Sequence, residues 1–128
     1  MFSVIAVVLP IAAATAQIRT EDECLRLHPQ ISSPVEYASC AYDGEGAERS
    51  MRAAYAKLRS KTGQDHRQLL EKAQSAWIAN RDAQCAYEAE GYPGSTMSSA
   101  SIIACVADAN RARAEYLMDD ARRWPSEK

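Results

Sequence analysis

Four cysteines are the side chains of this chain with the widest chemical range, because cysteines can pair, hold a metal or react as thiols. Structural zinc sites use cysteines two to four residues apart, and redox centres use C-x-x-C, but no two of these cysteines are so close. An even number in a small exported domain predicts two disulfides, for which three connectivities are possible. The cysteines are Cys24, Cys40, Cys85 and Cys105.

The other groups that commonly catalyse reactions form no recognisable site. His28 and His66 lie in different segments, and the chain has no G-x-S-x-G motif for a nucleophilic serine. Asp82 directly follows Arg81, but adjacent helix positions point about 100° apart, so we expect Asp82 to be a solvated or capping charge. The sequence therefore predicts no catalytic residue, no metal site and no cofactor, and a protein that is not an enzyme.

Trp77, Arg81 and Cys85 stand four residues apart in the stretch AQSAWIANRDAQC. On a helix, this spacing places the three side chains on one stripe. The tryptophan and the cysteine indicate that the stripe faces inward. The arginine then requires a carboxylate or carbonyl partner, because an unpaired buried charge is costly.

The overall composition indicates a single helical domain of 128 residues. Hydrophobic residues make up 47% of the chain and include a single phenylalanine, which is typical of a thin core between closely packed helices. Lysine and arginine number 15 and aspartate and glutamate 17, so the net charge is −2. This balance argues against a nucleic-acid-binding surface and against a polybasic membrane patch.

Residues 1–16 are uncharged and predict a secretory signal peptide. The apolar run from Val4 to Ala13 ends in Ala14-Thr15-Ala16, a small-x-small cleavage pattern before Gln17. The alternatives are an N-terminal core helix or a membrane anchor, but the run is too short to span a bilayer and Pro10 interrupts it. We therefore expect a periplasmic or secreted protein without stable membrane insertion after cleavage.

The first half of the exported chain predicts two helical segments. Residues 17–23 read as a polar lead-in, and residues 21–29 allow one or two helical turns before Pro29. Residues 36–61 have a helical composition, with a break expected at Gly44 and Gly46. Beyond the break, one apolar face is predicted at helical spacing from Met51, Ala54, Tyr55 and Leu58.

The second half predicts a long helical hairpin. Asp65 is a plausible N-cap for a helix over residues 66–90, and residues 90–99 predict a loop rich in serine, glycine and proline. Ser98 or Ser99 is expected to cap a last helix that ends near Arg123, before a frayed tail at 124–128. The core side of the first of these helices is predicted to be Leu69, Leu70, Ala73, Ala76 and Trp77. The predicted fold is all-α, a small disulfide-stapled bundle of three to four helices.

This arrangement favours one disulfide connectivity and one helix register. Antiparallel helices bring Cys85 close to Cys105, and Cys24 and Cys40 flank a turn, so we predict the pairs Cys24–Cys40 and Cys85–Cys105. One turn from the second disulfide, Arg81 faces Ala109; two turns away, Trp77 faces Arg113. We expect a cation–π contact between Arg113 and Trp77, with Trp77, Arg81 and Arg113 forming a structural seam.

The residues of the hairpin resemble the LprI family, which is named for a lysozyme inhibitor. The pattern A-Q-x-x-W-I-x-x-R-D-A-Q-C spans residues 73–85, and it is followed by Y-x-G-S at 92–95. Cys105 and then R-x-x-x-L at 113–117 complete it, so the resemblance covers residues 24–117. Upstream, Arg52 replaces the usual asparagine, and the glycines interrupt a stretch that is normally continuous helix. The resemblance implies an LprI-like helical domain over residues 24–123.

The resemblance implies binding and inhibition of lysozyme in the cell envelope. The residues that we expect to contact the partner lie on the 90–99 loop: Tyr92, Ser95, Thr96 and Ser98, with Glu88 and Glu90 steering towards a basic surface. The alternative is a structural or adaptor domain of the envelope that binds another protein, without enzymatic activity. That alternative predicts an exposed apolar patch around Tyr37, Tyr42 and the glycines.

Overall fold

The computed structural model describes residues 18–92 and 94–124, and these form five α-helices and no strand. The all-α prediction is confirmed, with both predicted disulfides present. The predicted signal peptide at 1–16 and the end of the tail, 125–128, lie outside the described residues. The helices are α1 (Glu21–Leu27), α2 (Pro34–Ala41), α3 (Gly44–Lys61), α4 (Gln64–Ala89) and α5 (Ser95–Arg123).

The two short helices begin at capping boxes that the sequence encodes locally. The Thr20 and Ser33 hydroxyls accept from the backbone N–H three residues on, and Glu23 and Glu36 accept from the N-cap backbones. These hydrogen bonds from backbone N–H groups lower the pKa of both glutamates. Pro34 occupies the first turn of α2, where its missing N–H costs nothing.

The break predicted at Gly44 and Gly46 occurs just before them, at Tyr42 and Asp43. Asp43 adopts a left-handed backbone (φ 46°), and its carboxylate accepts from the Gly46 N–H, which caps α3. A Cβ at Gly46 would overlap the Asp43 carboxylate, so a larger residue there would displace the side chain that caps α3. The glycines therefore lie in the first turn of a helix, and residues 18–92 and 94–124 form five helices because the 36–61 segment divides here.

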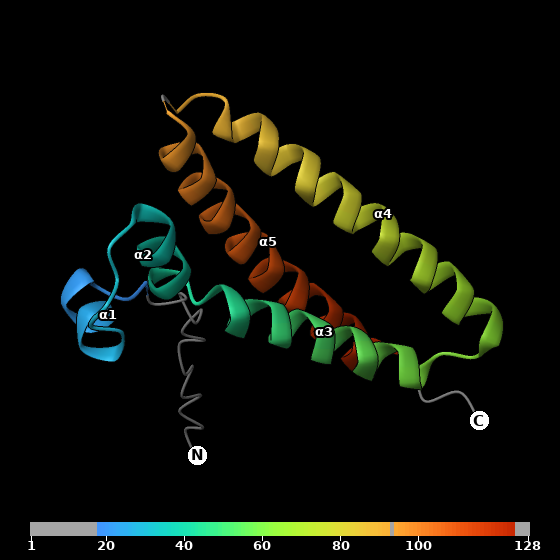
Figure 1. Cartoon of the computed structure of the whole chain (residues 1–128). Coiled ribbons are helices and arrows are strands. Elements are labelled where there is room, and N and C mark those ends of the chain that lie inside the picture. Colours follow the sequence, from blue (N-terminus) through green and yellow to red (C-terminus); the bar gives the residue numbers. More distant parts are fainter. Residues whose placement is uncertain (1–17, 93, 125–128) are drawn as a thin grey trace, which may run out of the picture.

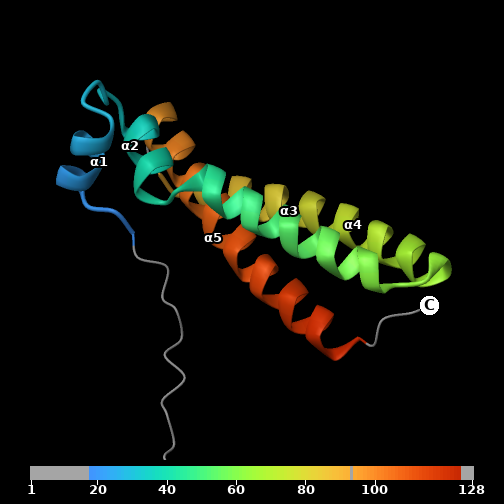
Figure 2. The same cartoon turned by 90° about the horizontal axis from the view of Figure 1, so that it is seen from below.

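The main core lies between α3 and α5. Met51, Ala54 and Leu58 of α3 are buried, as the apolar spacing predicted, against Ala114 and Leu117 of α5. Helix α5 is the central helix, because α2, α3 and α4 all pack on it, and α1 and α2 lie at one end of the long helices (Figures 1 and 2). The small residues on both faces let these backbones approach closely.

The α1–α2 end forms a second, smaller core around the first disulfide. Cys24 and Cys40 pair with their Cα atoms 5.9 Å apart, and Tyr37 and Tyr42 pack against them. Both tyrosines are half-buried and pack on this core, so the adaptor hypothesis was wrong to predict an exposed apolar patch around them. The backbone carbonyl of Tyr42 accepts from Arg111, which ties this core to α5.

Helix α4 packs on α5 through fewer apolar side chains than predicted. Leu70 and Trp77 do face the core, but Leu69 (65% exposed), Ala73 and Ala76 point to solvent. The prediction was wrong because the inward positions at Gln74 and Arg81 are polar, so hydrophobicity alone misplaced the face. Figure 1 shows α4 and α5 close at their connecting turn and diverging away from it.

The ends of α4 and α5 also differ from the prediction. Gly63, not Asp65, is the N-cap of α4, and α5 begins at Ser95, with Gly94 as its N-cap in place of Ser98 or Ser99. Gly94 has a φ of +86°, a conformation that side chains disfavour, and the helix begins four or five residues earlier than a cap at Ser98 or Ser99 would place it. The 90–99 segment is therefore a short turn followed by helix.

The far ends of the long helices are joined by polar and aromatic contacts. The Lys61 ammonium donates to the Ala121 carbonyl, and Arg59 donates to Glu71 across α3 and α4. Trp124 packs edge-on against His66, with ring centroids 4.9 Å apart. The prediction of a frayed tail at 124–128 is therefore wrong for Trp124, which belongs to the folded domain. In the described part of the chain, no helix has the length and apolar character needed to cross a membrane.

Candidate functional site

The predicted seam is a stack of cations and rings between α4 and α5. The Arg113 guanidinium lies 5.2 Å from the Trp77 ring centroid, as predicted, and the Arg81 guanidinium lies 5.3 Å from it. Arg113 also lies 5.1 Å from the Tyr116 ring centroid. Burial lowers the pKa of Arg113, while Tyr116 and Asp120 oppose this shift. The indole thus contacts two guanidinium groups, one from α4 and one from α5.

Arg81 finds the partners that a buried cation requires. Its side chain is only 13% exposed, and it donates to the Asp82 carboxylate at 2.9 Å and to the Asn110 side-chain oxygen at 2.9 Å. Asp82 is therefore the counter-ion of Arg81, and the expectation of a solvated or capping charge was incomplete. The contact on α5 is Asn110, one position beyond the predicted Ala109, because the long side chain reaches past the residue opposite its own Cα.

Two buried polar side chains extend the seam, and the sequence analysis did not assign either of them. Gln74 accepts from Arg113 Nε at 3.0 Å and its amide nitrogen lies 3.1 Å from the Met51 sulfur, so it joins all three long helices. Asn110 is buried beneath Arg81. Helical spacing could have indicated that Gln74 faces inward, because it precedes Trp77 by three residues and Arg81 by seven. These contacts make the seam a structural element, because its polar atoms pair with one another.

The four residues predicted to contact a partner lie at the α4–α5 turn, in the segment that the Cys85–Cys105 disulfide closes. Tyr92 is 51% exposed on the turn. Ser95 and Thr96 are exposed and Ser98 is half-buried, all in the first turn of α5 rather than on a loop.

Two further side chains at this end are more exposed than most apolar residues of the chain, Tyr87 (75%) and Met97 (48%). We call this surface the hairpin end and define it by Tyr87, Tyr92, Ser95, Thr96, Met97 and Ser98. Large exposed apolar side chains on a helix pair held by a disulfide can bind a protein without much ordering.

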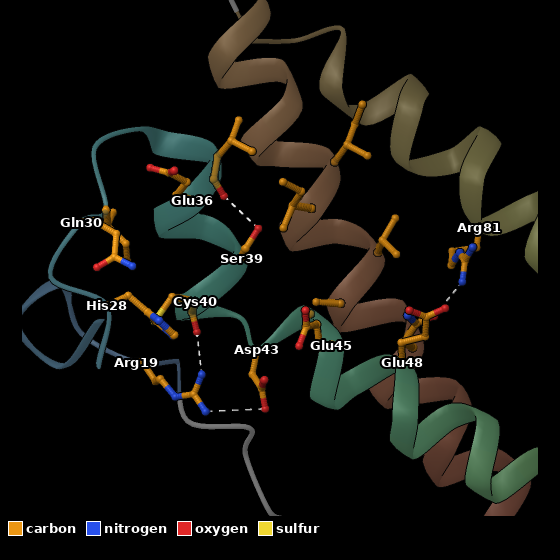
Figure 3. Close-up of a pocket in the computed structure, with 18 residues that line it drawn as sticks. Arg19, His28, Gln30, Glu36, Ser39, Cys40, Asp43, Glu45, Glu48 and Arg81 are labelled. Carbon is orange, nitrogen blue, oxygen red and sulfur yellow. Dashed lines mark hydrogen bonds and ion pairs between the residues drawn. The ribbon is translucent and has the colours of Figure 1, made fainter. Parts of the chain in front are cut away.

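A second surface is a groove of about 730 Å³ that the sequence analysis did not foresee. Figure 3 shows α5 running through it, with α2 on one side, α4 on the other and the start of α3 at its lower end. Its apolar lining consists of Ile31, Val35, Ile102, Ile103 and Val106. Sequence reasoning missed the groove because it forms only when α2 folds back against α5, which depends on the Tyr42–Asp43 break.

Carboxylates line this groove beside the start of α2 and beside the start of α3 (Figure 3). Glu36 of α2 and Asp43, Glu45 and Glu48 at the start of α3 contribute to its lining. Among the described residues, no group of three or more histidine, cysteine, aspartate or glutamate side chains is placed to hold a metal ion. The groove therefore offers apolar contact and negative charge, which are properties of a binding surface.

Comparison with known families identifies the chain. The family model described as "Lysozyme inhibitor LprI" matches residues 24–117, which include both disulfides, the seam and the α4–α5 turn. No curated protein and no solved structure matches the chain. The matched region exceeds half of the chain, so the protein belongs to the LprI family and the predicted resemblance is confirmed.

Proposed function

We propose that this LprI-family chain is an exported binding protein that inhibits a lysozyme through its hairpin end. The observation that carries the proposal is the family match over residues 24–117, because the family is described by lysozyme inhibition. An inhibitor acts by occupying a surface of another protein, which agrees with a non-enzymatic role. The proposal extends a family description to this chain and to one part of its surface.

The hairpin end is the surface that best suits insertion into an enzyme cleft. It stands at the tip of two helices, and the Cys85–Cys105 disulfide, with Cα atoms 5.6 Å apart, restrains it. Tyr92 and Met97 supply exposed apolar contact, and the hydroxyl groups of Ser95 and Thr96 supply hydrogen-bond donors. Glycoside hydrolases cut between two carboxyl groups, to which such donors can bind. A restrained tip loses little conformational entropy on binding.

Export is part of the proposal. Disulfides persist in oxidising compartments, and the first sixteen residues carry the pattern of a signal peptide. We infer that cleavage before Gln17 releases the helical domain into the periplasm or the medium. The predicted domain at 24–123, with a lead-in at 17–23, is too narrow, because α1 begins at Glu21 and Trp124 packs on the core. This location gives the protein access to enzymes that attack the cell wall.

The direct test is lysozyme activity on bacterial cell walls in the presence of the exported, oxidised protein, with lysozymes of several classes. The hairpin-end variant carries Tyr92→Ala, Ser95→Ala, Thr96→Ala and Ser98→Ala. Alanine keeps the first turn of α5 helical, and Gly94 stays in place because its φ is positive. We expect dose-dependent inhibition by the natural chain and loss of at least about tenfold in potency for the variant, the effect of removing one binding hot spot.

The matched control is Leu69→Ala, because Leu69 is equally exposed but lies towards the opposite end of α4. It should inhibit like the natural chain. Circular dichroism and thermal unfolding of all three proteins exclude misfolding. If the folded protein inhibits no lysozyme class, the proposed function is wrong. If the natural chain, the hairpin-end variant and Leu69→Ala inhibit equally well, the hairpin end is not the inhibitory surface.

A further inference from the structure

We propose that the groove over α5 binds a cationic amphipathic helix contributed by a protein partner. This surface is separate from the hairpin end, since no residue that defines the hairpin end lines the groove. The inference goes beyond lysozyme inhibition, because it assigns a second binding site and the chemistry of its ligand.

The apolar lining matches one face of a helix. Ile31 and Val35 lie on the α2 side, and Ile103 and Val106 lie on α5, all of them half-buried. Ile102 is 36% exposed, although isoleucine is among the residues most often fully buried. A groove bounded by helices and floored by branched aliphatic side chains is the surface on which an amphipathic helix lays its apolar face.

The cations that line the groove are already paired with other groups of the chain. Arg19 donates to the Cys40 carbonyl at 3.0 Å and lies 3.7 Å from Asp43, so these two charges offset each other. Arg81 is paired with Asp82 and Asn110. Neither arginine is therefore available to an anionic ligand without breaking an existing pair, and in Figure 3 both lie at the edges of the groove.

The remaining carboxylates are available to cations. Glu36 accepts only from the Ser32 and Ser33 groups at the start of α2 and, in the part of the chain that the structure describes, pairs with no cationic side chain. Glu45 and Glu48 pair with Arg49 and Arg52 one turn along α3, in exposed ion pairs that contribute little. A lysine or arginine from a bound helix can therefore replace these partners at small cost. An acidic or lipid-like amphiphile would meet these carboxylates instead, which favours the cationic ligand.

The test uses a synthetic helical probe and no lysozyme, so its failure is distinct from failure of the proposed function. The probe is a fluorescein-labelled peptide of about fourteen residues, four helical turns, with leucine on one face and lysine on the other. Its comparison peptide carries glutamate in place of every lysine. Fluorescence anisotropy is measured against the exported protein produced from the full chain. We expect saturable binding of the lysine peptide that weakens with salt, and no binding of the glutamate peptide.

Two variants locate the site. Glu36→Gln with Glu48→Gln removes two carboxylates, and glutamine at 36 still serves the capping box. This variant should bind the probe about threefold to thirtyfold more weakly, the range for losing two exposed ion pairs. Ile103→Ser reduces the apolar floor and should also weaken binding.

The matched control, Asp65→Asn with Glu115→Gln, makes the same change in net charge at exposed positions outside the groove. It should bind the probe like the natural chain, and thermal unfolding establishes that each variant folds.

Three results would overturn the proposal: no saturable binding of the lysine peptide, equal weakening by the groove variant and the control, or equal binding of the glutamate peptide. Sedimentation provides a separate test. A dimer of the natural chain that Ile103→Ser dissociates would assign the groove to a second copy of this chain and would also overturn the proposal.

Discussion

The two faces of α5 carry different kinds of side chain. Towards α3, it presents Ala114, Leu117 and Ala121, which are buried against the apolar face that carries Met51, Ala54 and Leu58. Towards α4, it presents Asn110 and Arg113, which contact long polar and aromatic side chains. The first interface resembles an ordinary helical core. The second is a hydrogen-bonded seam, held at one end by a disulfide.

The difference shows how one helix can have one interface that stabilises the fold and another that selects the register of its neighbour. Apolar packing supplies most of the free energy of folding, because buried area and close contact both favour it. A seam of paired polar groups adds less net stability, but each unpaired alternative is costly, so it selects one register of α4 on α5. The hairpin end is presented by the helix pair that depends on this seam and on its disulfide.

The largest expected effect breaks the α3–α5 face. Leu117→Ala removes a fully buried side chain and leaves a cavity, so the free energy of unfolding should fall by about 3–4 kcal/mol. Denaturant unfolding followed by circular dichroism measures it. All helices should unfold in one transition, because α2, α3 and α4 all pack on α5. A loss under about 1 kcal/mol would mean that this face is not the main core.

The second prediction separates the two faces by removing the disulfide of the hairpin. Replacing both Cys85 and Cys105 by serine should lower the free energy of unfolding by about 2–4 kcal/mol. Hydrogen exchange should increase more in α4 than in α3, because α4 has fewer apolar contacts to replace the covalent link. Replacing Cys24 and Cys40 instead should release α1 and leave the exchange of α4 near its natural rate. Equal effects of the two pairs on α4 would contradict the division into two faces.

The third prediction concerns the charge within the seam. Arg113→Met keeps the length of the side chain but removes its cation–π contacts and its hydrogen bond to Gln74. The free energy of unfolding should fall by about 1–2 kcal/mol. The control is Arg122→Met on the exposed face of the same helix, which should change it by less than about 0.5 kcal/mol. If the two variants are equally stable, the charge of Arg113 does not contribute to the free energy of unfolding.

The smallest expected effect is a pH dependence that originates away from both faces of α5. Hydrogen bonds from backbone N–H groups lower the pKa of Glu23 and Glu36 below the ordinary value of 4.5. Their contribution is therefore complete above about pH 4.5 and is lost as the pH falls through the lowered pKa values. Replacing both glutamates by glutamine should flatten the fall in thermal unfolding temperature between neutral and acidic pH. An unchanged pH profile would contradict this assignment.

Much of the fold could be predicted because its signals are local. The apolar spacing of Met51, Ala54 and Leu58 and the position of the cysteines around two turns each act within one or two helices. The disulfide pairing and the Trp77–Arg113 contact followed from the hairpin register, which a single short turn determines.

The remaining features depend on contacts that no local pattern encodes. The inward face of α4 was misjudged because Gln74 is buried by its tertiary partners and not by its own hydrophobicity. The start of α5 was placed four or five residues late, because the serine-rich stretch has the composition of a loop and the cap is Gly94. The groove requires α2, α3, α4 and α5 together, so it could be found only in the assembled structure.

The measurement that tests the account most directly is hydrogen exchange of the exported protein alone and with an inhibited lysozyme. Residues 87–98 should gain protection on addition of the enzyme, while the α3–α5 core keeps its exchange rates, because a restrained tip binds without refolding the domain. Protection confined to other parts of the molecule, with residues 87–98 unchanged, would contradict the claim that the seam and its disulfide serve to present the hairpin end.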